Sequence, residues 1–192
     1  MNERARLTLI SHAPTSAVRR AAFPCDESIE EIAQRPISEM NWRFDHACCG
    51  PEKRTQETAT VFGLSATVDP SLRDCDYGRW AGRDLSEVQS EFPNEVARWL
   101  SAPDAAPHGG ESIHNLIARV AAWLAEQTGS GRTIAVTHPS IIRAAVASIL
   151  EAPAQAFWRI DVAPLTLTDI RFNGSSWSLR SMGTLISNGT IE

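Results

Sequence analysis

The sequence lacks the features that mark membrane, secreted and nucleic-acid-binding proteins. No stretch reaches the roughly 18 consecutive apolar residues that a membrane span needs, and no signal-peptide core precedes the first apolar run. The formal net charge of −5 gives no general attraction to nucleic acid or anionic lipid. We therefore expect a cytoplasmic protein with no nucleic-acid or membrane partner, in which any anion is held by a local cluster of donors.

Cysteine is scarce, and its spacing does not suit metal or redox chemistry. The four cysteines include no CxxC pair, and two of them are adjacent, an arrangement that cannot easily form a disulfide. Histidines 46, 108 and 114 share no ligand spacing with them. We expect no metal and no cofactor, and we expect free thiols that mostly pack in the core: Cys25, Cys48, Cys49 and Cys75.

Linkers, internal repeats and low-complexity tracts are also missing. The 192 residues, of which 43% are hydrophobic, suit one domain with a sizeable core, and we expect a single domain over residues 1–192. β-Rich runs alternate with helical patterns along the chain, which favours an α/β fold. We predict a three-layer α/β/α domain whose central sheet is mostly parallel and carries an antiparallel hairpin at its edge.

Apolar periodicity and turn residues place the elements of this fold. The segment 68–72 has no clear pattern, and 74–82 is predicted to be a loop. Proline 93 is expected to divide the amphipathic segment 85–100 into two pieces, and proline 51 is expected in the first turn of its helix. Strands are predicted at 6–10, 43–48 and 133–137, a hairpin at 165–172 and 177–182, and helices at 28–33, after Gly50-Pro51, at 85–100, at 113–124 and after Pro139.

Two histidines and one arginine follow β-rich runs. His12 ends the run at 7–10, His138 ends the run at 133–137, and Arg54 lies about one turn into the helix after a third run. If the three strands are parallel neighbours, two imidazoles and a guanidinium meet at the edge of the sheet where open α/β folds bind ligands. The sequence therefore predicts a phosphate-handling site.

Five blocks in this order resemble the motifs of the histidine phosphatase superfamily, in its phosphoglycerate-mutase-like branch. The family opens with a strand ending in Arg-His-Gly followed by a threonine, and continues with Ser-Pro-Leu-x-Arg-Ala-x-Gln-Thr-Ala. Next come Leu-x-Glu-x-x-Phe-Gly-x-Trp-x-Gly, a Gly-Glu-Ser before a helix and a strand-ending second histidine. The corresponding segments are Ser11-His12-Ala13-Pro14-Thr15, 50–59, 72–82, Gly110-Glu111-Ser112 and His138, which together span nearly the whole chain.

The resemblance implies roles for the residues that match. His12 would be the nucleophile that accepts a phosphoryl group, Arg54 and His138 would hold its oxygens, and Asp74 would be the acid. Phosphoryl transfer needs an in-line nucleophile, donors for the charge on the equatorial oxygens and a proton for the leaving group, and no metal is required if cationic side chains supply the charge. The residues expected to bind the substrate are Ser11, Thr15, Arg20 and Ser140.

Several positions depart from the family pattern. Ser11 replaces the first arginine, and loss of such a preorganised donor lowers rates by roughly 10²- to 10³-fold in other enzymes. Arg20 matches a further phosphate-side arginine and could compensate, with Arg19 as its nearest rival. Asp74 is one methylene shorter than the family's glutamate, and Asp76 could act instead. Pro139 replaces a glycine and has no N–H to donate, so Ser140 would supply that bond.

Two functions are compatible with these residues. The first is a phosphomonoester hydrolase that acts through a phosphohistidine on a small phosphorylated metabolite; phosphoglycerate mutase activity fits less well, because the full cationic complement is missing. The alternative is a catalytically impaired protein of the same fold that binds phosphate or a phosphorylated ligand. Each residue also has a structural interpretation: His12 as a strand-end residue, Asp74 as a loop acid and Arg20 as a surface charge. The oligomeric state stays open, a homodimer included.

Overall fold

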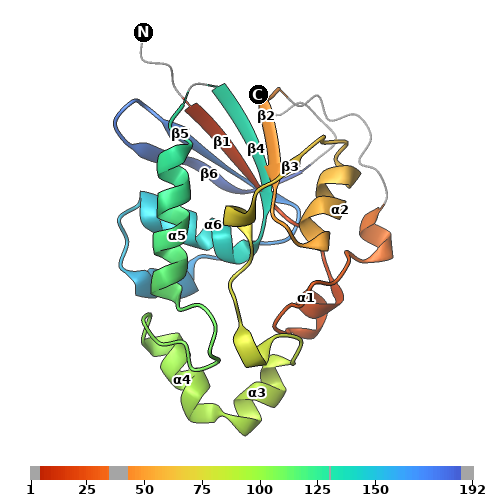
Figure 1. The fold of residues 1–192 in the computed structure, drawn as a ribbon, viewed down its shortest axis with the longest axis vertical. Coiled ribbons are helices and arrows are strands. Elements are labelled where there is room, and N and C mark those ends of the chain that lie inside the picture. The colour runs from red at the N-terminus through yellow and green to blue at the C-terminus, as the bar shows by residue number, and fades with distance from the viewer. Residues whose placement is uncertain (1–4, 35–42, 130, 187–192) are drawn as a thin grey trace.

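The computed structural model describes residues 5–34, 43–129 and 131–186, and it contains one six-stranded sheet (Figure 1). The strand order is β3-β2-β4-β1-β5-β6. The strands are β1 (Ala5–Ser11), β2 (His46–Cys49), β3 (Thr67–Val68), β4 (Gly131–Thr137), β5 (Thr166–Phe172) and β6 (Trp177–Leu185). The helices are α1 (Ser16–Arg20), α2 (Lys53–Val61), α3 (Leu85–Glu91), α4 (Pro93–Ser101), α5 (Ile113–Glu126) and α6 (Pro139–Ile149).

The pairing of the strands confirms the predicted fold class. β1 pairs parallel with β4, β4 with β2, and β2 with β3. β5 runs antiparallel to β1 and forms the predicted hairpin with β6. The three strands that precede the candidate residues are therefore parallel neighbours, in the order β2-β4-β1, as the site hypothesis required.

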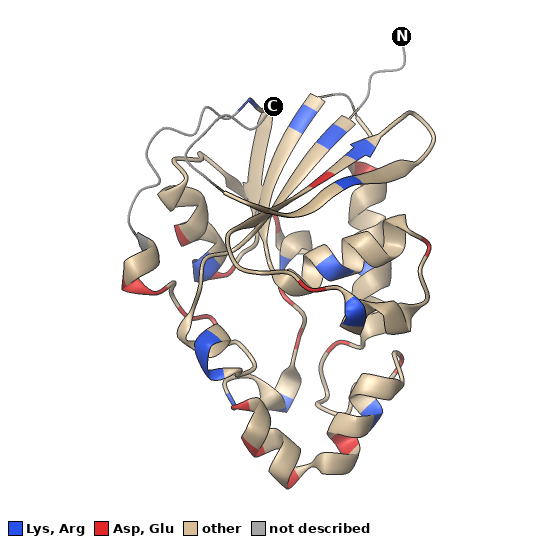
Figure 2. Cartoon of the chain, turned by 180° about the vertical axis from the view of Figure 1, so that it is seen from behind, with Lys and Arg blue, Asp and Glu red and all other residues tan. Residues whose placement is uncertain are grey.

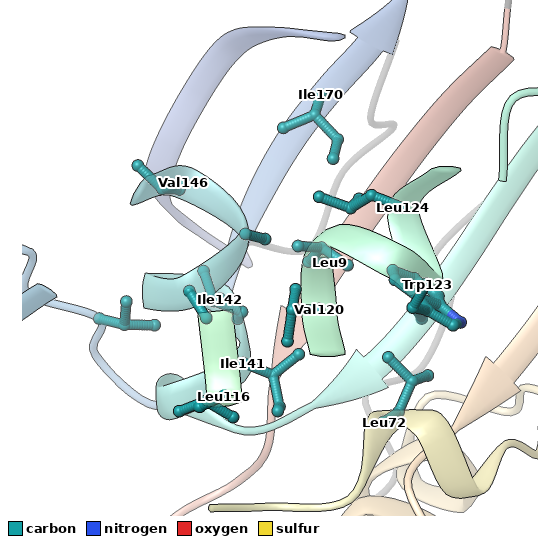
Figure 3. Close-up of a cluster of buried hydrophobic side chains, with 14 of the residues drawn as sticks. Leu9, Leu72, Leu116, Val120, Trp123, Leu124, Ile141, Ile142, Val146 and Ile170 are labelled. Atoms are coloured by element: carbon teal, nitrogen blue, oxygen red, sulfur yellow. The ribbon is translucent and has the colours of Figure 1, made fainter. Parts of the chain in front are cut away.

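Helices cover both faces of the sheet. α5 and α6 lie on one face and α2 on the other (Figure 1). Leu9 from β1 packs with Val120 of α5 and with Ile141 and Ile142 of α6 in the larger core cluster (Figure 3). A second cluster joins Ile10, Ile134 and Val136 to the apolar residues of α2 and its C-terminal turn. Leu9 and Ile10 are consecutive in β1 yet join different clusters, because successive side chains of a strand point to opposite faces of the sheet.

Some local predictions were wrong, and tertiary contacts explain them. No α-helix forms at 28–33; instead Ile29 bridges to Thr15, its N–H bonds to Glu57, and a 3-10 turn follows at Glu31–Gln34. Pro51 precedes α2 rather than standing in its first turn, because the N–H of Gly50 still bonds to the carbonyl of Val136 in the sheet. The segment without a clear pattern holds the short strand β3 and a 3-10 turn at Pro70–Leu72.

Two prolines lie where the sequence predicted them. Pro93 divides the amphipathic segment into α3 and α4, and Pro139 begins α6. All four cysteines are free thiols, of which Cys49 and Cys75 are buried and Cys25 is exposed.

Within the described residues, no helix is long and apolar enough to cross a membrane. Acidic and basic residues are interspersed over the strands, helices and loops (Figure 2).

Candidate active site

The carboxyl ends of β1, β4 and β2 bring the two imidazoles and the guanidinium together. His12 follows β1, His138 follows β4 as the N-cap of α6, and Arg54 lies in the first turn of α2 after β2. The ring centroids of His12 and His138 are 5.3 Å apart. One oxygen of Asp74, Oδ2, lies 2.7 Å from Nη2 of Arg54 and 3.5 Å from Nδ1 of His138. These four side chains are buried and form one continuous cluster.

His12 is held in the form that a nucleophile requires. Its Nδ1 lies 2.8 Å from the carbonyl oxygen of Ala13, so the proton is on Nδ1 and the lone pair is on Nε2. The N–H of Ala13 bonds in turn to the hydroxyl of Thr58 in α2, which fixes this turn against the helix. Burial and then the positive charge of His138 lower the pKa of His12 from 6.5 to about 3. The ring is therefore neutral at physiological pH.

Arg54 uses only part of its donor set within the protein. Nη2 donates to Asp74, and Nη1 donates to the carbonyl oxygen of Cys25 at 2.6 Å. Nε is buried and has no hydrogen-bond partner among the described residues. A guanidinium with five N–H donors thus keeps capacity for a further acceptor.

Asp74 is anchored as a carboxylate. Oδ2 accepts from Arg54, while Oδ1 accepts from the hydroxyl of Ser140 and from the N–H of Cys75. Burial alone would raise the pKa of Asp74, but the charges of His138 and Arg54 outweigh it and hold the pKa well below its usual range. In this arrangement Asp74 carries no proton for a leaving group. Its rival Asp76 is exposed and accepts from the N–H of Gly78.

The four expected substrate-binding residues fall into two groups. Ser140 bonds to Asp74, and Ser11 is fully buried beside His12 with a hydroxyl that has no partner in the described part of the chain. Thr15 instead caps α1 and donates to Glu27. Arg20 lies at the surface, 52% exposed, and pairs with Asp84, while its rival Arg19 pairs with Glu30.

Sequence reasoning missed Glu52. Its Oε2 lies 2.8 Å from Nε2 of His138, and its Oε1 accepts from the N–H of Asp74 at 2.9 Å. Burial would raise the pKa of Glu52, but its hydrogen bond to His138 lowers it overall. The only signal was the identity of the residue, an acid two positions before Arg54, and no periodicity separates such an acid from a solvated one.

Comparison with known proteins assigns the chain to a family. The model of the histidine phosphatase superfamily (branch 1) matches residues 16–184. A glucosyl-3-phosphoglycerate phosphatase of Mycolicibacterium vanbaalenii is 28% identical over 159 residues, which cover 66% of this chain and 70% of that protein. A bifunctional protein of Mycobacterium tuberculosis is 25% identical over 169 residues, 73% of this chain, but the match spans only 45% of that protein.

A solved structure has the same fold. The phosphoserine phosphatase of Entamoeba histolytica, in complex with 3-phosphoglyceric acid, superposes with a TM-score of 0.82. The superposition covers 94% of this chain and 97% of that one, at 19% sequence identity. At this level of identity the likeness concerns the fold.

Proposed function

The chain belongs to the histidine phosphatase superfamily (branch 1), and on that premise we propose that it hydrolyses phosphomonoesters through a phosphohistidine on His12. Nε2 of His12 attacks phosphorus, the bond to the ester oxygen breaks, and the departing oxygen takes up a proton. Water then attacks the phosphohistidine, the P–N bond breaks, and inorganic phosphate leaves. Cationic side chains supply the charge that this chemistry needs, so no metal is invoked.

One observation carries the proposal. Three polar atoms of the cluster are buried without a hydrogen-bond partner among the described residues: Oγ of Ser11, Nε of Arg54 and Nδ1 of His138. A buried polar group without a partner costs roughly 1–3 kcal/mol, and a catalytic role is one of the reasons for which native proteins keep such groups. Tetrahedral phosphate, rich in acceptor oxygens, would pair with donors from all three side chains next to Nε2 of His12.

Asp74 is the proposed proton donor, and it needs a rearrangement to act. A phosphoryl group on Arg54 competes with Asp74 for the guanidinium, and a carboxylate released from a cation binds a proton more readily. Ser140 and the N–H of Cys75 would keep the side chain in place during this exchange. In this proposal, substrate binding therefore promotes the protonation of Asp74.

The proposed substrate is a small phosphorylated metabolite in the cytoplasm. One relative is a glucosyl-3-phosphoglycerate phosphatase, and the Entamoeba phosphoserine phosphatase holds 3-phosphoglyceric acid, which supports a substrate of this class. Because the chain spans less than half of some of its relatives, the activity of the whole protein is part of the proposal. Its physiological substrate is left open within this class.

The test is turnover of p-nitrophenyl phosphate together with acid-quench trapping of labelled phosphohistidine. His12→Ala should lower kcat by at least about a thousandfold and abolish the label, because it removes the nucleophile. The matched control is His46→Ala, which removes an exposed histidine of β2 and should keep both signals. Equal turnover by wild type and His12→Ala would reject the mechanism.

The same experiment distinguishes the hydrolase from the second candidate function, a protein that only binds phosphorylated ligands. Ser11 in place of an arginine favours a protein that binds phosphorylated ligands without turning them over. That function predicts calorimetric binding of inorganic phosphate by wild type with neither turnover nor labelled phosphohistidine. A hydrolase should show phosphate binding, turnover and labelled phosphohistidine.

A further inference from the structure

Glu52 contacts two parts of the active site that are distant in the sequence. His138 is 86 residues from Glu52, and Asp74 is 22 residues from it. Its carboxylate holds the ring of His138 through one oxygen and the backbone N–H of Asp74 through the other. The side chain is 19% exposed, whereas the ring of His138 is fully buried. A single carboxylate thus ties the start of α6 to the loop that carries Asp74.

The close contact between Glu52 and His138 depends on Gly50. A Cβ at this position would lie 2.9 Å from the carbonyl oxygen of Leu72, 3.0 Å from Nε2 of His138 and 3.1 Å from Oε2 of Glu52. The first distance is shorter than real Cβ atoms show, and the other two are tighter than most Cβ contacts. In the motif that this segment resembles, serine stands at the position of Gly50 and leucine at that of Glu52. Both departures occur where the chain builds the carboxylate–imidazole pair.

Two carboxylates and one guanidinium surround the ring of His138. Oε2 of Glu52 lies 2.8 Å from Nε2, within hydrogen-bond distance, whereas Oδ2 of Asp74 lies 3.5 Å from Nδ1. That oxygen of Asp74 already accepts from Arg54, and the ring of His12 packs edge-on against the ring of His138. Among the described residues, Glu52 is therefore the carboxylate that holds the ring of His138 by a hydrogen bond.

We propose that Glu52 is a positioning residue: its hydrogen bond to Nε2 fixes the ring of His138 so that Nδ1 faces the phosphoryl group. A donor held in place in this way helps to compensate for the arginine that Ser11 replaces. The inference rests on the proposed function, because it concerns how the same site stabilises the transferring phosphoryl group. It assigns to Glu52 an indirect role, exerted through His138.

The decisive variants are Glu52→Gln, which keeps the shape of the side chain, and Glu52→Leu, which removes both hydrogen bonds. With p-nitrophenyl phosphate, Glu52→Gln should lower kcat roughly tenfold to a hundredfold while KM changes little, since a correctly placed donor acts mainly in the transition state. Glu52→Leu should lower kcat at least as far. Glu57→Gln, in α2, is the control, because that carboxylate bonds to the N–H of Ile29, and it should retain wild-type kcat.

Nitrogen NMR of ¹⁵N-histidine-labelled protein gives a readout that a merely structural role would not move. The His138 signals, assigned by their loss in His138→Asn, should show Nε2 hydrogen-bonded to a carboxylate in wild type. In Glu52→Gln the Nε2 signal should shift because the carboxylate acceptor is gone, with an unchanged thermal midpoint showing that the fold is intact. If Glu52→Leu does not fold, Glu52→Gln alone decides.

Wild-type kcat together with unchanged His138 signals in Glu52→Gln would overturn the inference. A wild-type protein without turnover or phosphohistidine would instead overturn the proposed function. In that case the NMR measurement still decides whether Glu52 holds the ring of His138, so the two failures are distinguishable.

Discussion

At the scale of single residues, burial keeps the ring of His12 neutral. The ring is 4% exposed, and the hydrogen bond from Nδ1 to the carbonyl of Ala13 leaves the lone pair on Nε2. Desolvation disfavours the charged form, and the charge of His138 adds to that effect. The lone pair is therefore available without a neighbouring base. The same burial should lower the free energy of unfolding at low pH.

Acidification should destabilise the fold through His12. The pKa is about 3 in the folded protein and 6.5 in the unfolded chain, so the unfolded chain takes up a proton first as the pH falls. The free energy of unfolding should decrease below about pH 6.5, with a limiting slope from this residue of roughly 1.4 kcal/mol per pH unit. Urea unfolding at about pH 7, 6 and 5 should give a shallower decrease for His12→Gln than for wild type. Parallel curves would contradict this account.

At the scale of elements, the loop between β3 and α3 is fastened on several sides. Leu72 packs in the larger core cluster next to Trp123 (Figure 3). Arg119 of α5 pairs with Glu111 through two hydrogen bonds and also donates to the carbonyls of Ser71, Arg73 and Asp74. A planar guanidinium can serve a carboxylate and several carbonyls at once. α5 therefore holds the backbone that aims Asp74 at the site.

Arg119→Lys should loosen this loop while keeping the charge. An ammonium group cannot reproduce the paired bonds to Glu111 together with the carbonyl contacts, and small misplacements of an active-site group reduce rates by up to about 10²-fold. We expect kcat to fall roughly tenfold or more, and amide hydrogen exchange of residues 73–76 to become faster. Arg98→Lys, on the exposed side of α4, is the control and should change neither quantity. Unchanged exchange in Arg119→Lys would show that the clamp is not needed.

At the scale of the whole molecule, the core and the site occupy different parts of one framework. The larger core cluster joins β1, β4 and β5 to α5 and α6, while the site lies at the carboxyl ends of the parallel strands. Leu116 of α5 is fully buried in this cluster. Core packing sets the free energy of folding, and the strand ends set the positions of the reactive groups.

Leu116→Ala should therefore separate stability from activity. Removing a buried leucine side chain from a packed core costs about 2–5 kcal/mol. Thermal or urea unfolding should show this loss, whereas kcat per folded molecule should stay within about twofold of wild type. Leu150→Ala is the control, since that side chain is 57% exposed and its removal should cost less than about 0.5 kcal/mol. A large fall in kcat for Leu116→Ala would show that the core and the site are coupled.

The sequence by itself determined the fold class, because the period of apolar residues records which face of an element is buried. α5, α6 and the β5–β6 hairpin carry long, regular patterns, and two β-rich runs ending in histidine were enough to predict that His12 and His138 lie at one edge of the sheet. That prediction needs only strand direction and neighbourhood, which parallel α/β folds restrict strongly.

Only the tertiary structure decided how the charged side chains pair. Arg20 forms an ion pair with Asp84, and Arg54 forms one with Asp74. Glu52 contacts His138, which is 86 residues away in the chain. The short helix α1 also depends on its surroundings, since five residues form a stable helix only when packed. The physical reason is one of range: hydrophobic periodicity is a local property of each segment, whereas an ion pair depends on distances of a few ångströms between elements that no local pattern encodes.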